Sequence, residues 1–146
     1  LENNLILVYT GEKRTAHKIA KTYASKLATV NKNYINEMIQ HVREGENILN
    51  QGKIDDFGKL LNSAWKTKKK LSSSISNTKI DSLYEYAIKK GALGGKLLGA
   101  GGGGFFLFYM KPDYKKKFIQ GSSKIINIPF KFTDIGSEII FKDLKR

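Results

Sequence analysis

The feature that most constrains the fold is a glycine-rich stretch at residues 91–104, which reads GALGGKLLGAGGGG. It contains eight of the fourteen glycines and runs directly into an apolar segment, FFLFYM, at residues 105–110. Glycine costs roughly 0.5–1 kcal/mol relative to alanine in regular structure, so four in a row indicate a left-handed bend or a close approach of backbone or ligand. A flexible linker is polar and serine-rich, whereas leucines and an alanine interrupt this stretch. We therefore expect it to be packed.

Two nucleotide-binding motifs resemble parts of this stretch, and both fail. Residues 99–104 match G-x-G-x-x-G, but a dinucleotide site needs that pattern after a strand and at the start of a helix. Here we expect a helix before it and a strand after it, with no acidic residue at the right distance. A P-loop needs G-x-x-x-x-G-K-[ST], whereas Lys96 is followed by Leu97 and Lys90 occupies the place of the first glycine.

Hydrophobic periodicity along the chain predicts an α+β fold with a small sheet. Residues 105–110 are apolar on both faces, so this strand should lie centrally in a covered sheet. Pro129 places its own strand at an edge or a bulge, because proline cannot donate a ladder hydrogen bond. The expected strands are residues 5–9, 105–110, 126–132 and 137–141, and the expected helices are residues 15–27, 34–49, 54–65, 78–88 and 112–118.

Short signals mark both ends of the helix at residues 78–88. Thr78 with Asp81 resembles a capping box at its start. Gly91 is placed as a C-terminal cap, so the glycine-rich stretch should begin where this helix ends.

Length and composition bound the class of protein. A chain of 146 residues is long enough for one domain with its own core. It has no cysteine, which suits a reducing cytoplasm, and no apolar run near the ~18 residues of a membrane helix. Because a strand is expected almost at once after Leu1, we interpret the chain as a fragment of a longer polypeptide.

The chain carries a net charge of +13 and has a pI near 9.8, which is compatible with nucleic acid, a membrane surface or anionic small molecules as partners. Much of the excess lies in lysine runs at residues 66–70, 115–117 and 142–146. We interpret these runs mainly as solvated surface.

The string GALGGKLLGAGGGGFFLFY resembles the third motif of the GHMP small-molecule kinases, in the branch that phosphorylates heptose 7-phosphate and related sugars. Three upstream pieces agree, namely LILVYTG followed by Arg14, then WKTKKKL, then ISN before Ile80-Asp81. The resemblance spans almost the whole chain, but only the C-terminal half of the family. It implies one domain over residues 1–146, a ferredoxin-like, largely antiparallel four-stranded sheet with several added helices.

The resemblance also implies how the work is divided between the two halves of such a kinase. ATP, Mg²⁺ and the catalytic aspartate would be held mainly by an N-terminal domain that is absent from this chain. The present chain would supply the glycine-rich motif to an active site between the domains, and alone it should be inactive. The implied substrate is a sugar phosphate, with heptose 7-phosphate phosphorylated at its anomeric oxygen favoured over fucose, galactose or mevalonate-type substrates.

Candidate site residues follow from phosphate chemistry, which needs donors and cations rather than a nucleophile. Arg14 and Thr15 sit where a strand end meets a helix start, a natural phosphate site. Lys96 could neutralise a phosphate, or it could be a solvated loop lysine. The glycine amides could form an anion-binding nest, or the glycines could only permit tight packing. These glycines are Gly99, Gly101, Gly102, Gly103 and Gly104.

No catalytic residue is expected in this chain, because the resemblance places the catalytic aspartate in the N-terminal half. No metal-binding residue is expected either, because His17 and His41 lack a third ligand at metal spacing. Two other functions remain open. An RNA-binding ferredoxin-like domain would explain the charge, but its central strand must expose one aromatic face. The second alternative is a non-catalytic domain, which would form a homodimer through the edge strand at residues 137–141.

Overall fold

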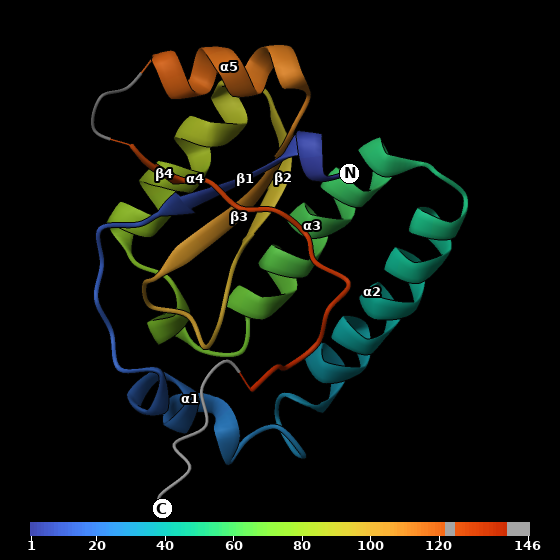
Figure 1. Ribbon diagram of the computed structural model, residues 1–146. Helices are drawn as coiled ribbons and strands as arrows, with labels where there is room; N and C mark the ends of the chain where they lie inside the picture. Colours follow the sequence, from blue (N-terminus) through green and yellow to red (C-terminus); the bar gives the residue numbers. More distant parts are fainter. Residues whose placement is uncertain (122–124, 140–146) are drawn as a thin grey trace, which may run out of the picture.

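The computed structural model describes residues 1–121 and 125–139, and it confirms an α+β fold (Figure 1). In the described residues, two short 3₁₀ turns, η1 (Glu2–Asn4) and η2 (Ser73–Ile75), accompany five helices and four strands. In chain order these are β1 (Leu5–Tyr9), α1 (Ala16–Ala24), α2 (Lys32–Asn50), α3 (Ile54–Lys69), α4 (Thr78–Lys89), β2 (Ala92–Leu97), β3 (Phe105–Met110), α5 (Pro112–Gln120) and β4 (Ile126–Ile128).

The sheet has the order β2-β3-β1-β4, and each neighbouring pair of strands is antiparallel. Helices α1 to α4 connect β1 to β2, a hairpin joins β2 to β3, and α5 connects β3 to β4. This arrangement is the ferredoxin-like fold that was predicted. In Figure 1, α3 and α4 lie behind the sheet, α2 lies outside α3, and α1 lies at the end of the molecule where the β2–β3 loop turns.

The core lies between the sheet and helices α3 and α4. Phe106 and Phe108 of β3 stack with ring centroids 4.8 Å apart, and Trp65 of α3 meets Phe106 edge-on at 5.4 Å. Tyr84 of α4 closes the cluster at 5.9 Å from Phe108. Such aromatic pairs contribute about 0.5–1.5 kcal/mol each beyond their buried area. The central position predicted for the strand at residues 105–110 is confirmed, because β3 lies between β2 and β1.

Three predictions about strands need correction. Strand β2 was missed, because Gly94, Gly95 and Lys96 interrupt the apolar pattern by which strands are found. The strand expected at residues 126–132 ends at Ile128, before Pro129. The final strand expected at residues 137–141 is wrong for residues 137–139, which have no regular structure, and its last two residues lie outside the described part.

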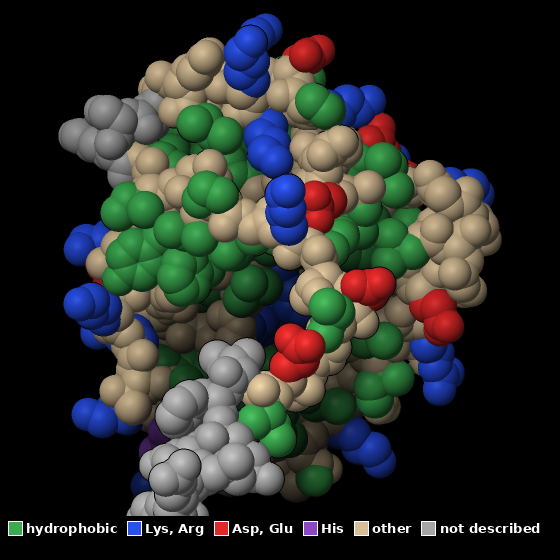
Figure 2. Space-filling model, in the orientation of Figure 1, with side chains coloured by type: hydrophobic (Ala, Val, Ile, Leu, Met, Phe, Trp, Pro, Cys, Tyr) green, Lys and Arg blue, Asp and Glu red, His purple; other side chains and the backbone are tan. Residues whose placement is uncertain are grey.

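The surface shows how the positive charge is distributed. On the face seen in Figure 2, lysine and arginine side chains lie both at the rim and in the upper middle rather than in one patch, and hydrophobic side chains gather to the left and right of them. Phe105 and Ile126 are among the partly exposed apolar residues, at 38% and 54% exposure. None of the helices in the described residues combines the length and the apolar character that a bilayer crossing requires.

Candidate phosphate-binding site

The glycine-rich motif forms the loop at residues 98–104, which joins the antiparallel strands β2 and β3. Three of its amides are hydrogen-bonded within the protein. The Leu98 amide donates to the carbonyl of Phe105 at 2.9 Å, the Gly102 amide to that of Ile75 at 2.8 Å, and the Gly104 amide to that of Glu12 at 3.1 Å. The loop therefore packs between the segment after β1 and the segment before α4, as expected from its leucines and alanine. No protein acceptor is found, within the described residues, for the amides of Gly101 and Gly103.

Glycine is required in this loop by the closeness of neighbouring backbone. A Cβ atom on Gly103 would lie 2.4 Å from the carbonyl oxygen of Glu12, which no side-chain rearrangement could relieve. Gly102 has a φ of 73°, and a Cβ there would lie 3.2 Å from the carbonyl oxygen of Ser74. Both interpretations of the glycines are therefore compatible with the geometry. The loop is tightly packed, yet the amides of Gly101 and Gly103 have no acceptor among residues 1–121 and 125–139.

A cavity of about 410 Å³ lies beside this loop. Three residues proposed from the sequence, Arg14, Thr15 and Gly102, line it together. Its other lining residues are Lys18, Ile19, Ser74, Ser76 and Asn77. Two cations, hydroxyl groups and an amide around one small cavity are the groups that bind a phosphate.

Two helices begin at this cavity. Thr15 is the N-cap of α1 and Asn77 is the N-cap of α4. The positive end of a helix dipole and its unpaired first-turn amides favour an anion, so the two helix starts add to the charge of Arg14 and Lys18. The sequence assigned the cap of α4 to Thr78; in the structure the Asn77 side chain accepts the amide hydrogen of Ile80 at 3.0 Å, so the cap lies one residue earlier.

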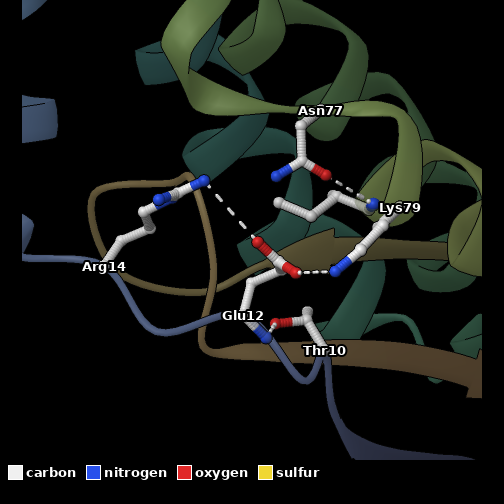
Figure 3. A network of polar contacts seen from close by, with 6 residues as sticks. Thr10, Glu12, Arg14, Asn77 and Lys79 are labelled. Carbon is white, nitrogen blue, oxygen red and sulfur yellow. Dashed lines mark hydrogen bonds and ion pairs between the residues drawn. The ribbon is translucent and has the colours of Figure 1, made fainter.

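Glu12 orients the cations at the edge of this site (Figure 3). Its carboxylate lies between Arg14, whose Nη2 is 3.6 Å away, and Lys79, whose Nζ is 2.9 Å away. The Arg14 side chain remains 52% exposed, and among the described residues Glu12 is its ion-pair partner, so its guanidinium can also reach a ligand. The hydrogen bond from Lys79 holds the pKa of the Glu12 carboxyl below its ordinary value, despite an opposing effect of desolvation.

This network gives a pH prediction. Because the folded-state pKa of Glu12 is depressed, its ion pairs stabilise the fold above the unfolded-state pKa and are lost as the pH falls through the folded-state value. We expect an NMR titration of the Glu12 carboxyl to show a midpoint below the ordinary glutamate pKa. Lys79→Met should raise this midpoint, since the largest cause of the shift is removed. Lys89→Met, which removes a charge from the other end of α4, should leave it unchanged; an equal rise in both variants would contradict the assignment.

The other residues proposed from the sequence are not among those that line this cavity. Lys96 lines a larger, mainly apolar cavity of about 480 Å³ between α2 and α3, where burial lowers its pKa. Gly99 accepts a hydrogen bond from Lys68 through its carbonyl, and Gly101 packs against Ile75. The structure thus brings Arg14, Thr15 and Gly102 together and places Lys96 elsewhere.

Sequence reasoning missed several residues of the site. Ser74 and Ser76 belong to a serine-rich segment that was interpreted only as a loop, and they reach the cavity because η2 turns the chain there. Glu12 gave no signal, since its partners lie 2 and 67 residues away along the chain. The Asn77 cap was the one recoverable signal, because asparagine before a helix is a preferred N-cap.

The donor set fits a phosphate but not a metal ion. Mg²⁺ prefers carboxylate oxygens, and across residues 1–121 and 125–139 there is no cluster of three histidine or acidic side chains that could hold a metal. The groups that line the cavity are therefore suited to positioning and charge neutralisation of a phosphate.

Comparison with known proteins identifies the family. Residues 46–121 match the family model for the C-terminal domain of GHMP kinases. The chain belongs to the GHMP kinase family and corresponds to its C-terminal domain. It is 30% identical over 123 residues to a bifunctional fucokinase/GDP-fucose pyrophosphorylase of Arabidopsis thaliana, a match covering 82% of this chain and 12% of that protein. It is 40% identical over 72 residues to D-glycero-alpha-D-manno-heptose 7-phosphate kinase of Campylobacter jejuni, covering 47% of this chain and 21% of that kinase.

Solved structures agree with this assignment. The fold resembles mevalonate kinase of L. major, with a TM-score of 0.75 at 20% identity over 84% of this chain and 40% of that one. Mevalonate kinase of Methanococcus jannaschii gives a TM-score of 0.63 at 26% identity, over 84% of this chain and 38% of that one. The chain therefore spans well under half the length of the relatives it matches.

Proposed function

We propose that this chain is the part of an ATP-dependent sugar or sugar-phosphate kinase that carries the loop at residues 98–104 and the Arg14 cavity. The observation that carries the proposal is the meeting of Arg14, Thr15 and Gly102 around one cationic cavity, beside a glycine loop whose Gly101 and Gly103 amides have no acceptor among the described residues. Phosphoryl transfer depends mainly on positioning and charge neutralisation, which such groups supply.

The active site would be completed by an N-terminal domain of the same polypeptide. When bound there, ATP with Mg²⁺ would supply the transferred phosphoryl group. On this side, Arg14 and Lys18 would bind the phosphate already present on the sugar, and the helix starts at Thr15 and Asn77 would add their partial charge. The amides of Gly101 and Gly103 would donate hydrogen bonds to the phosphoryl group while it is transferred. Alone, this chain should bind anions but transfer nothing.

The favoured substrate is heptose 7-phosphate, phosphorylated at its anomeric oxygen. A kinase of that substrate is 40% identical over 72 residues, and a dianionic 7-phosphate suits the cationic cavity. Fucose is the second candidate, because two relatives, from Arabidopsis thaliana and Bacteroides fragilis, are described as fucokinases and match longer parts of this chain.

An assay of the complete polypeptide tests the proposal. It should transfer phosphate from ATP to heptose 7-phosphate, with the product identified by NMR as the anomeric phosphate. Fucose, galactose and mevalonate are the competing acceptors in the same assay. If none of these four acceptors is phosphorylated, the kinase proposal is overturned.

The central strand β3 supports an RNA-binding function less well than the cavity supports a kinase. Phe106, Phe108 and Tyr109 of β3 have no exposed surface, and only Phe105 offers a partly exposed ring. An RNA-binding sheet needs several aromatic rings on its open face. RNA binding would be favoured over the kinase function if the complete polypeptide phosphorylated none of the sugars but gave a salt-sensitive gel shift with single-stranded RNA.

A further inference from the structure

Lys68 is the least exposed charged residue of the cluster of lysines at the end of α3. It is only 6% exposed, although the sequence placed it in a solvated charge run, and that interpretation is wrong for this residue. Its neighbours behave differently: Lys66 is exposed, and Lys69 pairs with Asp81 at 3.1 Å. An ammonium group is buried only when its hydrogen bonds or a counter-charge offset the loss of hydration.

The Lys68 ammonium is hydrogen-bonded to the beginning of the glycine loop. Its Nζ donates to the carbonyl of Leu97 at 2.9 Å and to the carbonyl of Gly99 at 2.5 Å. In the described part of the chain no carboxylate pairs with it, and burial together with the charge of Lys96 lowers its pKa to about 8. Hydrogen bonds to a charged donor contribute about 1.5–3 kcal/mol each, so this ammonium is a strong anchor for the loop.

The rest of the loop is fixed by other parts of the protein. The Gly102 amide is held by Ile75 and the Gly104 amide by Glu12, so the middle and end of the loop are attached beside the Arg14 cavity. At Gly99 the backbone has a φ of 68°, and a Cβ atom on this residue would meet nothing within 4 Å, so local packing does not hold it. At the start of the loop, the Leu98 amide donates to the carbonyl of Phe105 at 2.9 Å and the Tyr23 hydroxyl to the carbonyl of Ala100 at 3.4 Å. Lys68 adds two charged hydrogen bonds to this part of the loop, at Leu97 and Gly99.

We propose that Lys68 is a positioning residue, whose ammonium fixes the backbone of the loop at residues 98–104 so that its free amides are aimed for phosphoryl transfer. This inference rests on the proposed kinase function. Lys68 does not line the cavity of Arg14, so it acts through the loop rather than by touching the ligand. A displacement of about 1 Å in such a loop can cost about a hundredfold in rate.

The test compares Lys68→Met with Lys66→Met in the complete polypeptide. Methionine keeps an unbranched apolar side chain at position 68 and removes the ammonium, and Lys66 is an exposed lysine of the same helix. Hydrogen exchange should accelerate at least ~tenfold at the Gly102 and Gly104 amides of Lys68→Met, with Phe106 and Phe108 of β3 unchanged, because local opening is confined to the loop. The kcat of phosphoryl transfer should fall about a hundredfold, with little change in the KM for the sugar. Lys66→Met should match the parent protein.

The outcomes separate this inference from the kinase proposal. Unchanged loop exchange in Lys68→Met would overturn the inference whether or not the parent protein is a kinase. Faster loop exchange with an unchanged kcat would also overturn it. A parent protein that phosphorylates no acceptor would overturn the proposed function and, with it, the catalytic role given to Lys68, and only its attachment of the loop would stand. If Lys68→Met does not fold, NMR of the parent protein decides. Hydrogen-bonded Lys68 ammonium protons should exchange slowly enough to be seen, and loss of their signal to the rapid exchange expected of Lys66 would contradict the anchor.

Discussion

Replacement of Gly94 by alanine is expected to destabilise this domain by about 3 kcal/mol, because β2 and α3 touch through their backbones at this point. A Cβ atom on Gly94 would lie 2.1 Å from the carbonyl oxygen of Gly58 and 2.8 Å from the amide nitrogen of Asn62. Neither neighbour is a side chain that could rotate away, so the strand and helix must separate. A loss of this size corresponds to a fall in Tm of roughly 10 °C for a domain of this length.

Urea-induced unfolding of the 146-residue chain, followed by the fluorescence of its single tryptophan, measures this effect. Trp65 is fully buried between α3 and the sheet, so its emission reports the packing that Gly94 permits. Gly136→Ala is the matched control, since its Cβ would meet nothing within 4 Å, and its unfolding free energy should change by less than about 0.5 kcal/mol. Equal stability of the two variants would show that α3 does not rest on β2 as described.

The second large effect is expected at Arg14. Arg14→Met in the complete polypeptide should raise the KM for heptose 7-phosphate about a hundredfold, because charge-assisted hydrogen bonds to the sugar phosphate are lost. The KM for fucose, which carries no phosphate, should change less than about threefold, since only the dianion needs the guanidinium. Steady-state kinetics with the two sugars separate these results.

Lys13→Met is the control for charge alone. Lys13 is exposed, adjacent in sequence and not among the residues that line the cavity. Lys13→Met removes the same unit of charge as Arg14→Met but no side chain that lines the cavity. The KM for either sugar should therefore stay close to that of the parent protein. If Arg14→Met and Lys13→Met raised the KM equally, the cavity would contribute only general electrostatic attraction and the site assignment would fail.

Much of the fold could be predicted because the apolar patterns in this chain are strong. The residues of β1 and β3 form continuous apolar runs, and the expected helices coincide with α1 to α5 within a few residues. Strand β2 could not be found in this way, because its inner positions are glycines. The absence of a side chain at Gly94 lets α3 approach, and at Gly95 it makes room for Phe108 of β3; both requirements are visible only in the folded structure. Conversely, residues 137–139 belong to a segment expected as a strand but have no regular structure.

The site was only partly predictable for a related reason. Arg14 and Thr15 lie in the short connection between β1 and α1, immediately before the helix, so their place at a helix start could be predicted from local sequence. Lys68 looked like one lysine among several, and its burial depends on carbonyls 29 and 31 residues further along the chain. The role of Glu12 likewise depends on Lys79, which only the folded arrangement of β1 and α4 brings within 2.9 Å.

The central claim is that the glycine loop and the Arg14 cavity form one wall of a kinase active site. A crystal structure of the complete polypeptide with heptose 7-phosphate and a non-hydrolysable ATP analogue tests it most directly. We predict that the 7-phosphate contacts the Arg14 guanidinium, and that the anomeric oxygen faces the γ-phosphate beside the loop at residues 98–104. A sugar bound away from this cavity, with the loop facing solvent, would contradict the claim.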